Sequence, residues 1–193
     1  MVAYSLSDSR KYPAPSVTAE VARYPRFSPS AAVREISAAR DALSWALPLI
    51  SEAVAHAVRQ PGEWPVGTNL AHLVIYEERI ALPVLSALAE GKDGRDRVVS
   101  GEENWLAREA EGLSDGPYAA VRERFQTIIR RHVEQLEAFD EEAFNAPLCS
   151  LWASGFGALV PAGWVTKKSV QHLWEHGHTL IRAGWRAYTV GKK

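Results

Sequence analysis

Residues 117–139, PYAAVRERFQTIIRRHVEQLEAF, carry the pattern that decides the fold class. Apolar side chains recur every three or four positions, while Arg122, Glu123, Arg130 and Glu134 fall off that stripe. The stripe consists of Val121, Phe125, Ile128, Ile129, His132, Leu136 and Phe139. This is the spacing of an amphipathic α-helix with one buried face. The segment therefore predicts a long helix from about Pro117 to Phe139.

The same period recurs in three other long segments. The first begins at Ser28-Pro29, where serine suits the cap and proline the first helical position, and runs to about Gln60 with a kink at Pro48. The second leads from residues 65–68 to Glu90-Gly91, with a kink just before Pro83. The last runs from Thr166, as its cap, to about Tyr188.

Two long connections separate these helices. Residues 92–116 are charged and interrupted by glycine, with a short helix at 102–110, and residues 145–165 are rich in Gly, Pro, Ala and Trp. No segment has the alternating pattern of a strand. The sequence thus predicts an all-α protein, a four-helix bundle with long crossover loops over residues 29–190. Residues 1–28, with three prolines, are expected to form an extended or disordered N-terminal arm.

Composition narrows the class of protein. A chain of 193 residues with 47% apolar content suits one globular domain. The net charge of −1 comes from 22 basic and 23 acidic residues without a basic stripe, so we expect no nucleic-acid partner. The absence of a long apolar run predicts no membrane span. A single cysteine, Cys149, and the absence of a signal peptide predict a cytoplasmic protein.

Histidines on two predicted helices indicate a metal site. His172 and His176 are four residues apart, so a helix directs both imidazoles to the same side. His72 lies beside the apolar stripe of the second helix, near its start. Three neutral imidazoles on facing helices can hold a divalent transition metal such as zinc, nickel or iron and leave a coordination position open. The predicted ligands are His72, His172 and His176, and binding is expected to weaken as the pH falls through about 6.5.

Two segments resemble signatures of the DinB/YfiT-like family. Residues 63–73, EWPVGTNLAHL, are similar to its tryptophan, spacer and "aHL" motif, and the pair His172 and His176 is similar to its second histidine motif. Residues 136–144 resemble the usual end of its third helix, and the likeness spans about residues 30–187. The resemblance implies an up-down-down-up four-helix bundle, a homodimer, and a divalent metal held by the three histidines.

The resemblance also implies a chemistry. Relatives include thiol-dependent transferases and isomerases that use low-molecular-weight thiols, so we expect a metal-dependent transferase or isomerase acting on a small electrophile as small-molecule substrate. Two alternatives stay open. One is a non-catalytic dimeric binding or stress-response module, and the other is a metal-hydroxide hydrolase. The metal, the thiol and the catalytic residues are not specified by the sequence.

Other candidate residues have simpler interpretations. We expect His132 to be a satisfied core histidine, His178 to be exposed, and Arg79 to form a surface ion pair with a neighbouring glutamate. Glu175 is adjacent to His176 but points away from it, and it is a candidate for supporting a neighbouring residue of the site. Cys149 is expected to be a small buried side chain. The tryptophans of the second crossover, Trp152 and Trp164, are candidates for lining a pocket.

Overall fold

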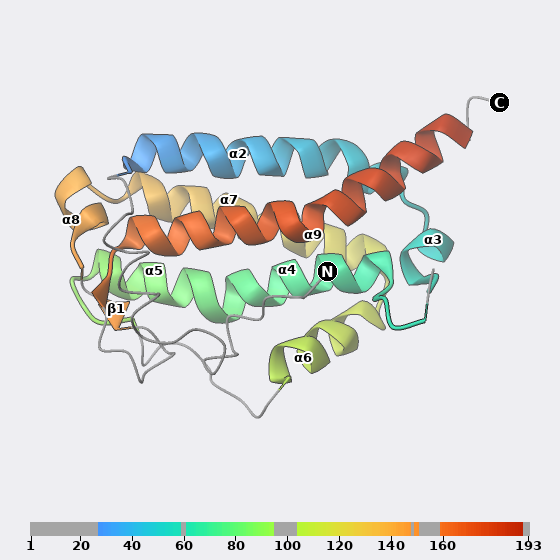
Figure 1. Ribbon diagram of the computed structural model, residues 1–193, viewed down its shortest axis with the longest axis horizontal. Helices are drawn as coiled ribbons and strands as arrows, with labels where there is room; N and C mark the ends of the chain where they lie inside the picture. Colours follow the sequence, from blue (N-terminus) through green and yellow to red (C-terminus); the bar gives the residue numbers. More distant parts are fainter. Residues whose placement is uncertain (1–26, 59–60, 95–103, 148, 151–158, 191–193) are drawn as a thin grey trace.

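The computed structural model describes residues 27–58, 61–94, 104–147, 149–150 and 159–190. The described chain is almost entirely helical, and the prediction of an all-α fold is confirmed (Figure 1). Its helices are α2 (Pro29–Ala46), α3 (Glu52–His56), α4 (Val66–Tyr76), α5 (Leu82–Ala89), α6 (Trp105–Ser114), α7 (Tyr118–Glu137), α8 (Glu141–Asn145) and α9 (Ala162–Val190). A 3₁₀ turn, η1 (Leu47–Leu49), and a π-helical turn, η2 (Glu77–Ala81), adjoin α2 and α4, respectively.

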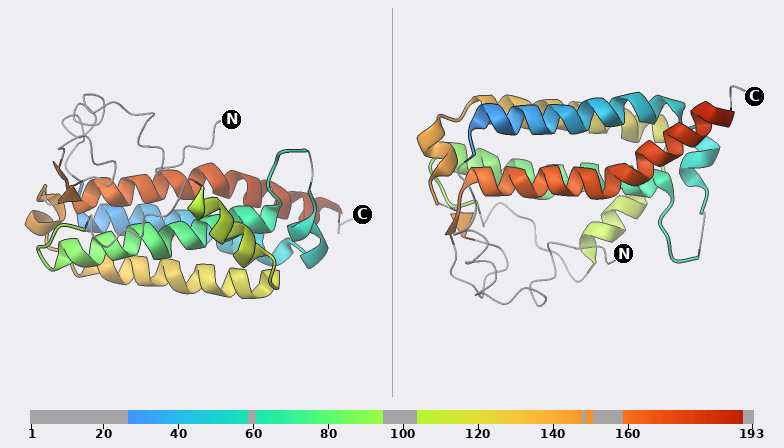
Figure 2. Two further views of the ribbon diagram at one scale, coloured as in Figure 1. Left: turned by 90° about the horizontal axis from the view of Figure 1, so that it is seen from below. Right: turned by 45° about the horizontal axis from the view of Figure 1, so that its top comes forward.

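Four long helical segments pack side by side. α2 contacts both α7 and α9, and α4 contacts the same two helices from the other side. The colours in Figure 1 show that α2 and α9 run in one direction along the molecule, whereas α4–α5 and α7 run in the opposite direction. The turned views in Figure 2 show the same grouping.

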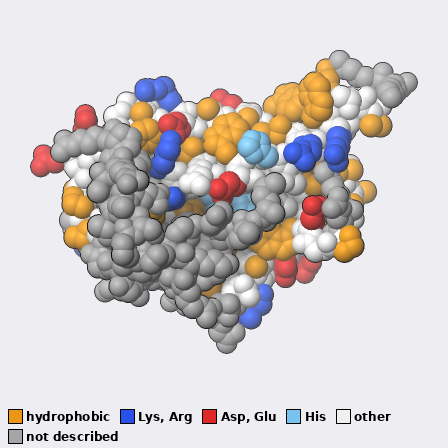
Figure 3. Space-filling view, viewed as in Figure 1, with side chains coloured by type: hydrophobic (Ala, Val, Ile, Leu, Met, Phe, Trp, Pro, Cys, Tyr) orange, Lys and Arg blue, Asp and Glu red, His pale blue; other side chains and the backbone are white. Residues whose placement is uncertain are grey.

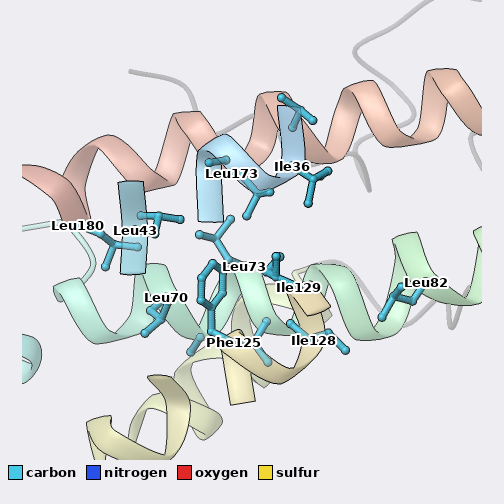
Figure 4. Packing of buried hydrophobic residues seen from close by; sticks show 14 of the residues in the cluster. Ile36, Leu43, Leu70, Leu73, Leu82, Phe125, Ile128, Ile129, Leu173 and Leu180 are labelled. Atoms are coloured by element: carbon cyan, nitrogen blue, oxygen red, sulfur yellow. The ribbon is translucent and has the colours of Figure 1, made fainter. Parts of the chain in front are cut away.

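The apolar stripes of these helices meet in the middle of the molecule. Leu43 of α2, Leu73 of α4, Phe125 of α7 and Leu173 of α9 are each about fully buried and belong to one core cluster. Figure 4 shows these side chains directed into the space between the four segments. Removing apolar surface from water in this way is the main force that stabilises the bundle.

The first predicted helix starts as expected but ends early. Ser28 caps α2 by accepting a hydrogen bond from the backbone N–H of Ala31, and Pro29 is the first helical residue. The helix gives way after Ala46 to the 3₁₀ turn that contains Pro48, and Ser51 caps the separate helix α3. The irregularity at Pro48 agrees with the predicted kink, but the helix breaks there, and the predicted extent to about Gln60 is wrong because α3 ends at His56. Proline lacks the N–H that would continue the ladder, and its ring crowds the preceding turn.

The second predicted helix is irregular just before Pro83, where the sequence placed a kink. Residues 77–81 form the π-helical turn η2, and the N–H of Leu82 bonds to the carbonyl of Glu77, five residues earlier. Pro83 removes one donor and crowds the carbonyl four residues before it, which favours a wider turn here. The turn accommodates an extra residue between α4 and α5.

The third helix agrees with the prediction, whereas the fourth begins earlier than expected. α7 spans Tyr118–Glu137, within two residues of the expected bounds. α9 already includes Ala162, and the hydroxyl of Thr166 donates to the carbonyl of Ala162 at 3.0 Å. Thr166 is therefore an internal helical residue and not a cap, because its hydroxyl finds a carbonyl one turn back.

The two connections contain short elements. The first includes α6, longer than the helix predicted for residues 102–110, and α6 packs against α4. The second includes two strands, β1 (Cys149–Ser150) and β2 (Leu159–Val160), which pair antiparallel with Cys149 opposite Val160. The predicted N-terminal arm lies outside the described residues except for its last two. The division into an arm and a domain at residues 29–190 stays a prediction, and among the described helices none is long and apolar enough to cross a membrane.

Candidate metal centre

The packing of α4 against α9 brings the three predicted histidines together. His72 lies on α4, and His172 and His176 lie one turn apart on α9. One ring nitrogen of each residue can be chosen so that all three atoms lie within 4.8 Å of one another. The Nε2 atoms of His72 and His172 are 3.0 Å apart. In the described part of the chain this is the one group of three or more potential ligands with that geometry.

Burial keeps these imidazoles neutral. His72 and His172 are each 6% exposed, and His176 is partly buried. Loss of hydration lowers the pKa of His72 to about 3, with His176 as a second, electrostatic cause, and lowers the pKa of His176 to about 4. Burial, together with the two neighbouring imidazoles, also holds the pKa of His172 well below 6.5. At neutral pH each residue thus presents an unprotonated ring nitrogen, the form that binds a metal.

Aromatic rings surround the three histidines. The indole of Trp64 lies 5.1 Å from the His72 ring and stacks on the His176 ring at 6.4 Å, measured between centroids. The phenol ring of Tyr76 meets His172 edge to face at 4.2 Å. Trp64 is partly exposed, whereas Tyr76 is buried. Figure 3 shows histidine atoms near the middle of the face on which α9 and α4 lie.

The outer ring nitrogens differ in their contacts. Nδ1 of His176 is 3.0 Å from Oδ1 of Asn69, one turn before His72 on α4. The Nδ1 atoms of His72 and His172 are buried and have no hydrogen-bond partner among the described residues. Burial raises the pKa of Tyr76 above its ordinary value, so its hydroxyl stays protonated at all physiological pH values. The centre is therefore a cluster of neutral imidazoles, largely removed from water, whose nitrogens are potential metal ligands.

The remaining predicted residues lie away from this cluster. His132 is fully buried on α7 and pairs with Glu77, Nδ1 to Oε2 at 2.6 Å, whereas its Nε2 has no hydrogen-bond partner among the described residues. His178 is exposed. Arg79 forms an ion pair, but its partner is Glu109 of α6 and not an adjacent glutamate. Glu175 accepts a hydrogen bond from Gln171 and is exposed.

The expectation for the crossover residues is tested only in part. Trp152 and the side chain of Cys149 lie outside the described residues. Trp164 is 4% exposed. The Nζ atom of Lys168 lies over its ring, 5.3 Å from the ring centroid, in a cation–π contact.

Sequence reasoning assigned no role in the cluster to three of its residues, namely Trp64, Asn69 and Tyr76. Asn69 and Tyr76 stand three positions before and four after His72, so helical spacing alone would have placed both on its face. Trp64 precedes the helix, and no periodicity could have placed its ring over His72 and His176.

Fold and site together define an all-α protein with a three-histidine cluster between two long helices. The chain belongs to the DinB superfamily, whose sequence model matches residues 35–180. A search of curated protein sequences gave no significant match. Among solved structures, the crystal structure of the colibactin self-resistance protein ClbS in complex with double-stranded DNA is similar. It has a TM-score of 0.55 and 16% sequence identity over 88% of this chain and 98% of that chain.

This neighbour corrects one expectation. The net charge of −1 predicts no nucleic-acid partner, yet ClbS, a protein of the same fold, was crystallised in complex with double-stranded DNA. Net charge averages over the whole surface, whereas binding depends on where charges lie, so the balance of 22 basic and 23 acidic residues does not support an exclusion. The homodimer implied by the family resemblance stays untested.

Proposed function

We propose that His72, His172 and His176 bind one divalent transition metal and that the protein is a metal-dependent enzyme. The observation that carries this proposal is the convergence of three neutral ring nitrogens from two helices within 4.8 Å. The donor set fits a metal, because imidazole nitrogens suit zinc, nickel and iron and must be unprotonated to bind. Three protein ligands also leave a coordination position open to other molecules.

The proposed reaction is thiol transfer to a small electrophile, or a thiol-dependent isomerisation. When bound, the ion would supply a Lewis acid that favours the thiolate form of a thiol or polarises a carbonyl group. The chain's own residues hold the donors in place and limit access of water. Trp64 covers two of the three histidines, and Tyr76 packs against the third.

The arrangement of the inner ring nitrogens favours a metal-dependent enzyme over a filled, non-catalytic module. Nε2 of His72 and Nε2 of His172 lie 3.0 Å apart, and His176 adds a third ring nitrogen to a group that spans at most 4.8 Å. Three imidazoles grouped in this way supply the ligand atoms that one ion needs.

Elemental analysis of untagged protein tests the metal. We expect about one transition-metal ion per chain in the native protein and none in the His172→Ala, His176→Ala double variant. His178→Ala is the matched control, because His178 is an exposed histidine on the same helix. Metal retained by the double variant, or absent from the native protein after growth with added zinc, nickel and iron, would contradict the proposal.

An activity screen then separates the reaction classes. The loaded protein would be mixed with small electrophiles and with esters, each with and without a low-molecular-weight thiol. Turnover of electrophiles that requires the thiol supports the transferase or isomerase. Ester cleavage without thiol would instead favour a hydrolase, and no turnover in any arm would favour a binding module. The cytoplasmic location stays a prediction.

A second candidate function is binding of double-stranded DNA. It is favoured by one observation, the crystal structure of ClbS in complex with double-stranded DNA. Fluorescence anisotropy with a labelled duplex at low and high salt tests it. Binding that weakens steeply with salt would support a phosphate-contacting surface. A flat signal at low salt would remove this candidate and leave the metal-centre proposal unaffected.

A further inference from the structure

Asn69 links the start of α4 to one histidine of the metal centre. Its Nδ2 donates to the backbone carbonyl of Pro65 at 3.1 Å and, at 3.4 Å, to that of Trp64. Its Oδ1 lies 3.0 Å from Nδ1 of His176, on α9. One amide side chain thus contacts the residue whose indole covers the centre and also the outer nitrogen of a candidate ligand.

These contacts fix which way the amide of Asn69 points. Carbonyl oxygens only accept hydrogen bonds, so the side of the amide facing Trp64 and Pro65 must be the NH₂ group. The opposite orientation would set three oxygens against one another. Oδ1 therefore faces His176.

The orientation of Asn69 in turn fixes the tautomer of His176. An amide oxygen has no proton to give, so the hydrogen bond to His176 requires the proton on Nδ1. In a neutral imidazole the other nitrogen then carries a lone pair, and here that is Nε2. Nε2 of His176 is then the nitrogen available to the group that this residue forms with His72 and His172, whose own Nε2 atoms lie 3.0 Å apart.

We propose that Asn69 is a positioning residue that holds His176 as the Nδ1–H tautomer, with the Nε2 lone pair directed at the three-histidine centre. The role given to this tautomer rests on the proposed function, because a metal would bind the lone pair on Nε2. Its structural content, the tautomer, can be tested on metal-free protein. Hydrogen-bond partners of this kind orient ligand histidines and raise their basicity.

Two variants separate this role from a merely structural one. Asn69→Leu keeps the size of the side chain but removes the acceptor for His176 and the donor for the two carbonyls. Asn69→Asp keeps an acceptor for His176, removes the donor and adds a negative charge. Asn145→Leu is the matched control, because Asn145 bonds backbone groups of Phe27 and Glu141 in a similar way, and none of these hydrogen bonds involves a residue of the centre.

Long-range ¹H–¹⁵N spectra of the histidine rings, recorded on metal-free protein near pH 7.5, report each tautomer directly. His176 would be assigned by comparison with His176→Gln. We expect the Nδ1–H form in the native protein, in Asn69→Asp and in Asn145→Leu, and a loss of that form in Asn69→Leu. An Nε2–H form in the native protein, or an unchanged His176 in Asn69→Leu, would overturn the assignment.

Affinity for Co²⁺, measured by competition with a chromogenic chelator, gives the second readout. We expect Asn69→Leu to bind about 10–100-fold more weakly than the native protein, with Asn69→Asp close to native, as for other partners of ligand histidines. Equal affinity in Asn69→Leu would overturn the positioning role. If the native protein binds no Co²⁺ while the spectra show the expected tautomers, the proposed metal function fails and the assignment of the tautomer stands.

Discussion

The Nε2 atoms of His72 and His172 lie 3.0 Å apart although the two residues are 100 positions apart in the sequence. Two neutral imidazoles at this distance share one proton, because one nitrogen must donate and the other accept. Two nitrogens on a tetrahedral ion with bonds of about 2.0–2.1 Å stand about 3.4 Å apart, so a shift of a few tenths of an ångström would admit a metal. α4 and α9 hold the two rings close to that geometry.

Metal binding should therefore stabilise the fold. At a free Zn²⁺ concentration of 100 times Kd the free energy of unfolding should rise by about 2.7 kcal/mol, which for a chain of this size raises Tm by roughly 5–10 °C. Scanning calorimetry with and without Zn²⁺ measures the shift. His172→Gln should abolish the shift and His178→Gln should keep it. An equal shift in His172→Gln would locate the stabilising ion elsewhere.

Acid should destabilise the metal-free protein through the same histidines. Burial lowers the pKa of His72 to about 3 and that of His176 to about 4, whereas unfolding returns both to about 6.5. Between these values the unfolded chain binds more protons, so the free energy of unfolding falls as the pH falls from 6.5 towards 4. The slope is up to about 1.4 kcal/mol per pH unit for each histidine. Urea denaturation at a series of pH values tests this, with His72→Gln, His176→Gln as the comparison. The same slope in native and variant proteins would count against it.

The lowered pKa values also change the expected pH range of metal binding. From sequence alone, binding should weaken near pH 6.5, the ordinary pKa of histidine. Because burial lowers the pKa of His72 to about 3 and that of His176 to about 4, protons should compete only under more acidic conditions. We expect Zn²⁺ occupancy, measured by dialysis and elemental analysis, to be the same at pH 7.5 and 5.5. A half-maximal loss near pH 6.5 would mean that the folded histidines titrate as exposed ones do.

The buried pair of Glu77 and His132 should be coupled. Each side chain is at most 1% exposed, and His132 Nδ1 lies 2.6 Å from Glu77 Oε2. Glu77→Leu or His132→Leu alone should destabilise the protein by about 3–5 kcal/mol, because each leaves a buried partner unpaired. The double variant should lose less than the sum of the two. Chemical denaturation measures all three, and additive losses would disprove the coupling.

An exposed ion pair provides the control for this cycle. Lys167 and Glu35 lie 3.0 Å apart, and their side chains are 49% and 37% exposed. Water screens such pairs, so Glu35→Ala should cost less than about 1 kcal/mol. A cost as large as that of Glu77→Leu would show that burial is not what distinguishes the two pairs.

A side chain at Gly184 should force α9 away from α2. A Cβ atom there would lie 2.6 Å from the carbonyl oxygen of Ala46 and 2.9 Å from its Cα and Cβ atoms. Because these are mostly backbone atoms of a packed helix, Gly184→Ala should destabilise the protein by about 1–3 kcal/mol, despite the better helix propensity of alanine. Thermal denaturation monitored by circular dichroism measures the change in stability.

Gly112 of α6 is the matched control for Gly184. It is also inside a helix, but a Cβ atom there would meet nothing within 4 Å. Gly112→Ala should therefore stabilise the protein by about 0.5–1 kcal/mol, since alanine favours the helical backbone. If both substitutions changed stability in the same direction, close packing at Gly184 would not be the cause.

Local sequence determined the helices and part of the site. The apolar spacing in residues 117–139 predicted α7 almost to its ends, and Ser28-Pro29 predicted the start of α2, because period and capping depend on neighbours within one or two turns. The same locality placed His172 and His176 on one side of α9. The local pattern did not predict that α2 ends at Ala46 or that α9 begins before Thr166. Both boundaries depend on tertiary packing, which decides how far each helix extends.

Only the tertiary structure decided what surrounds those histidines. The packing of α4 on α9 sets Nε2 of His72 beside that of His172, and the path of the chain before α4 lays Trp64 over His72 and His176. The hydrogen bond between Nδ1 of His176 and Oδ1 of Asn69 joins residues 107 positions apart. The sequence by itself determined which side chains share a helix face, because a face repeats every few residues. The distances between faces of different helices, and the burial that lowers the pKa values of these histidines, exist only once the helices pack together.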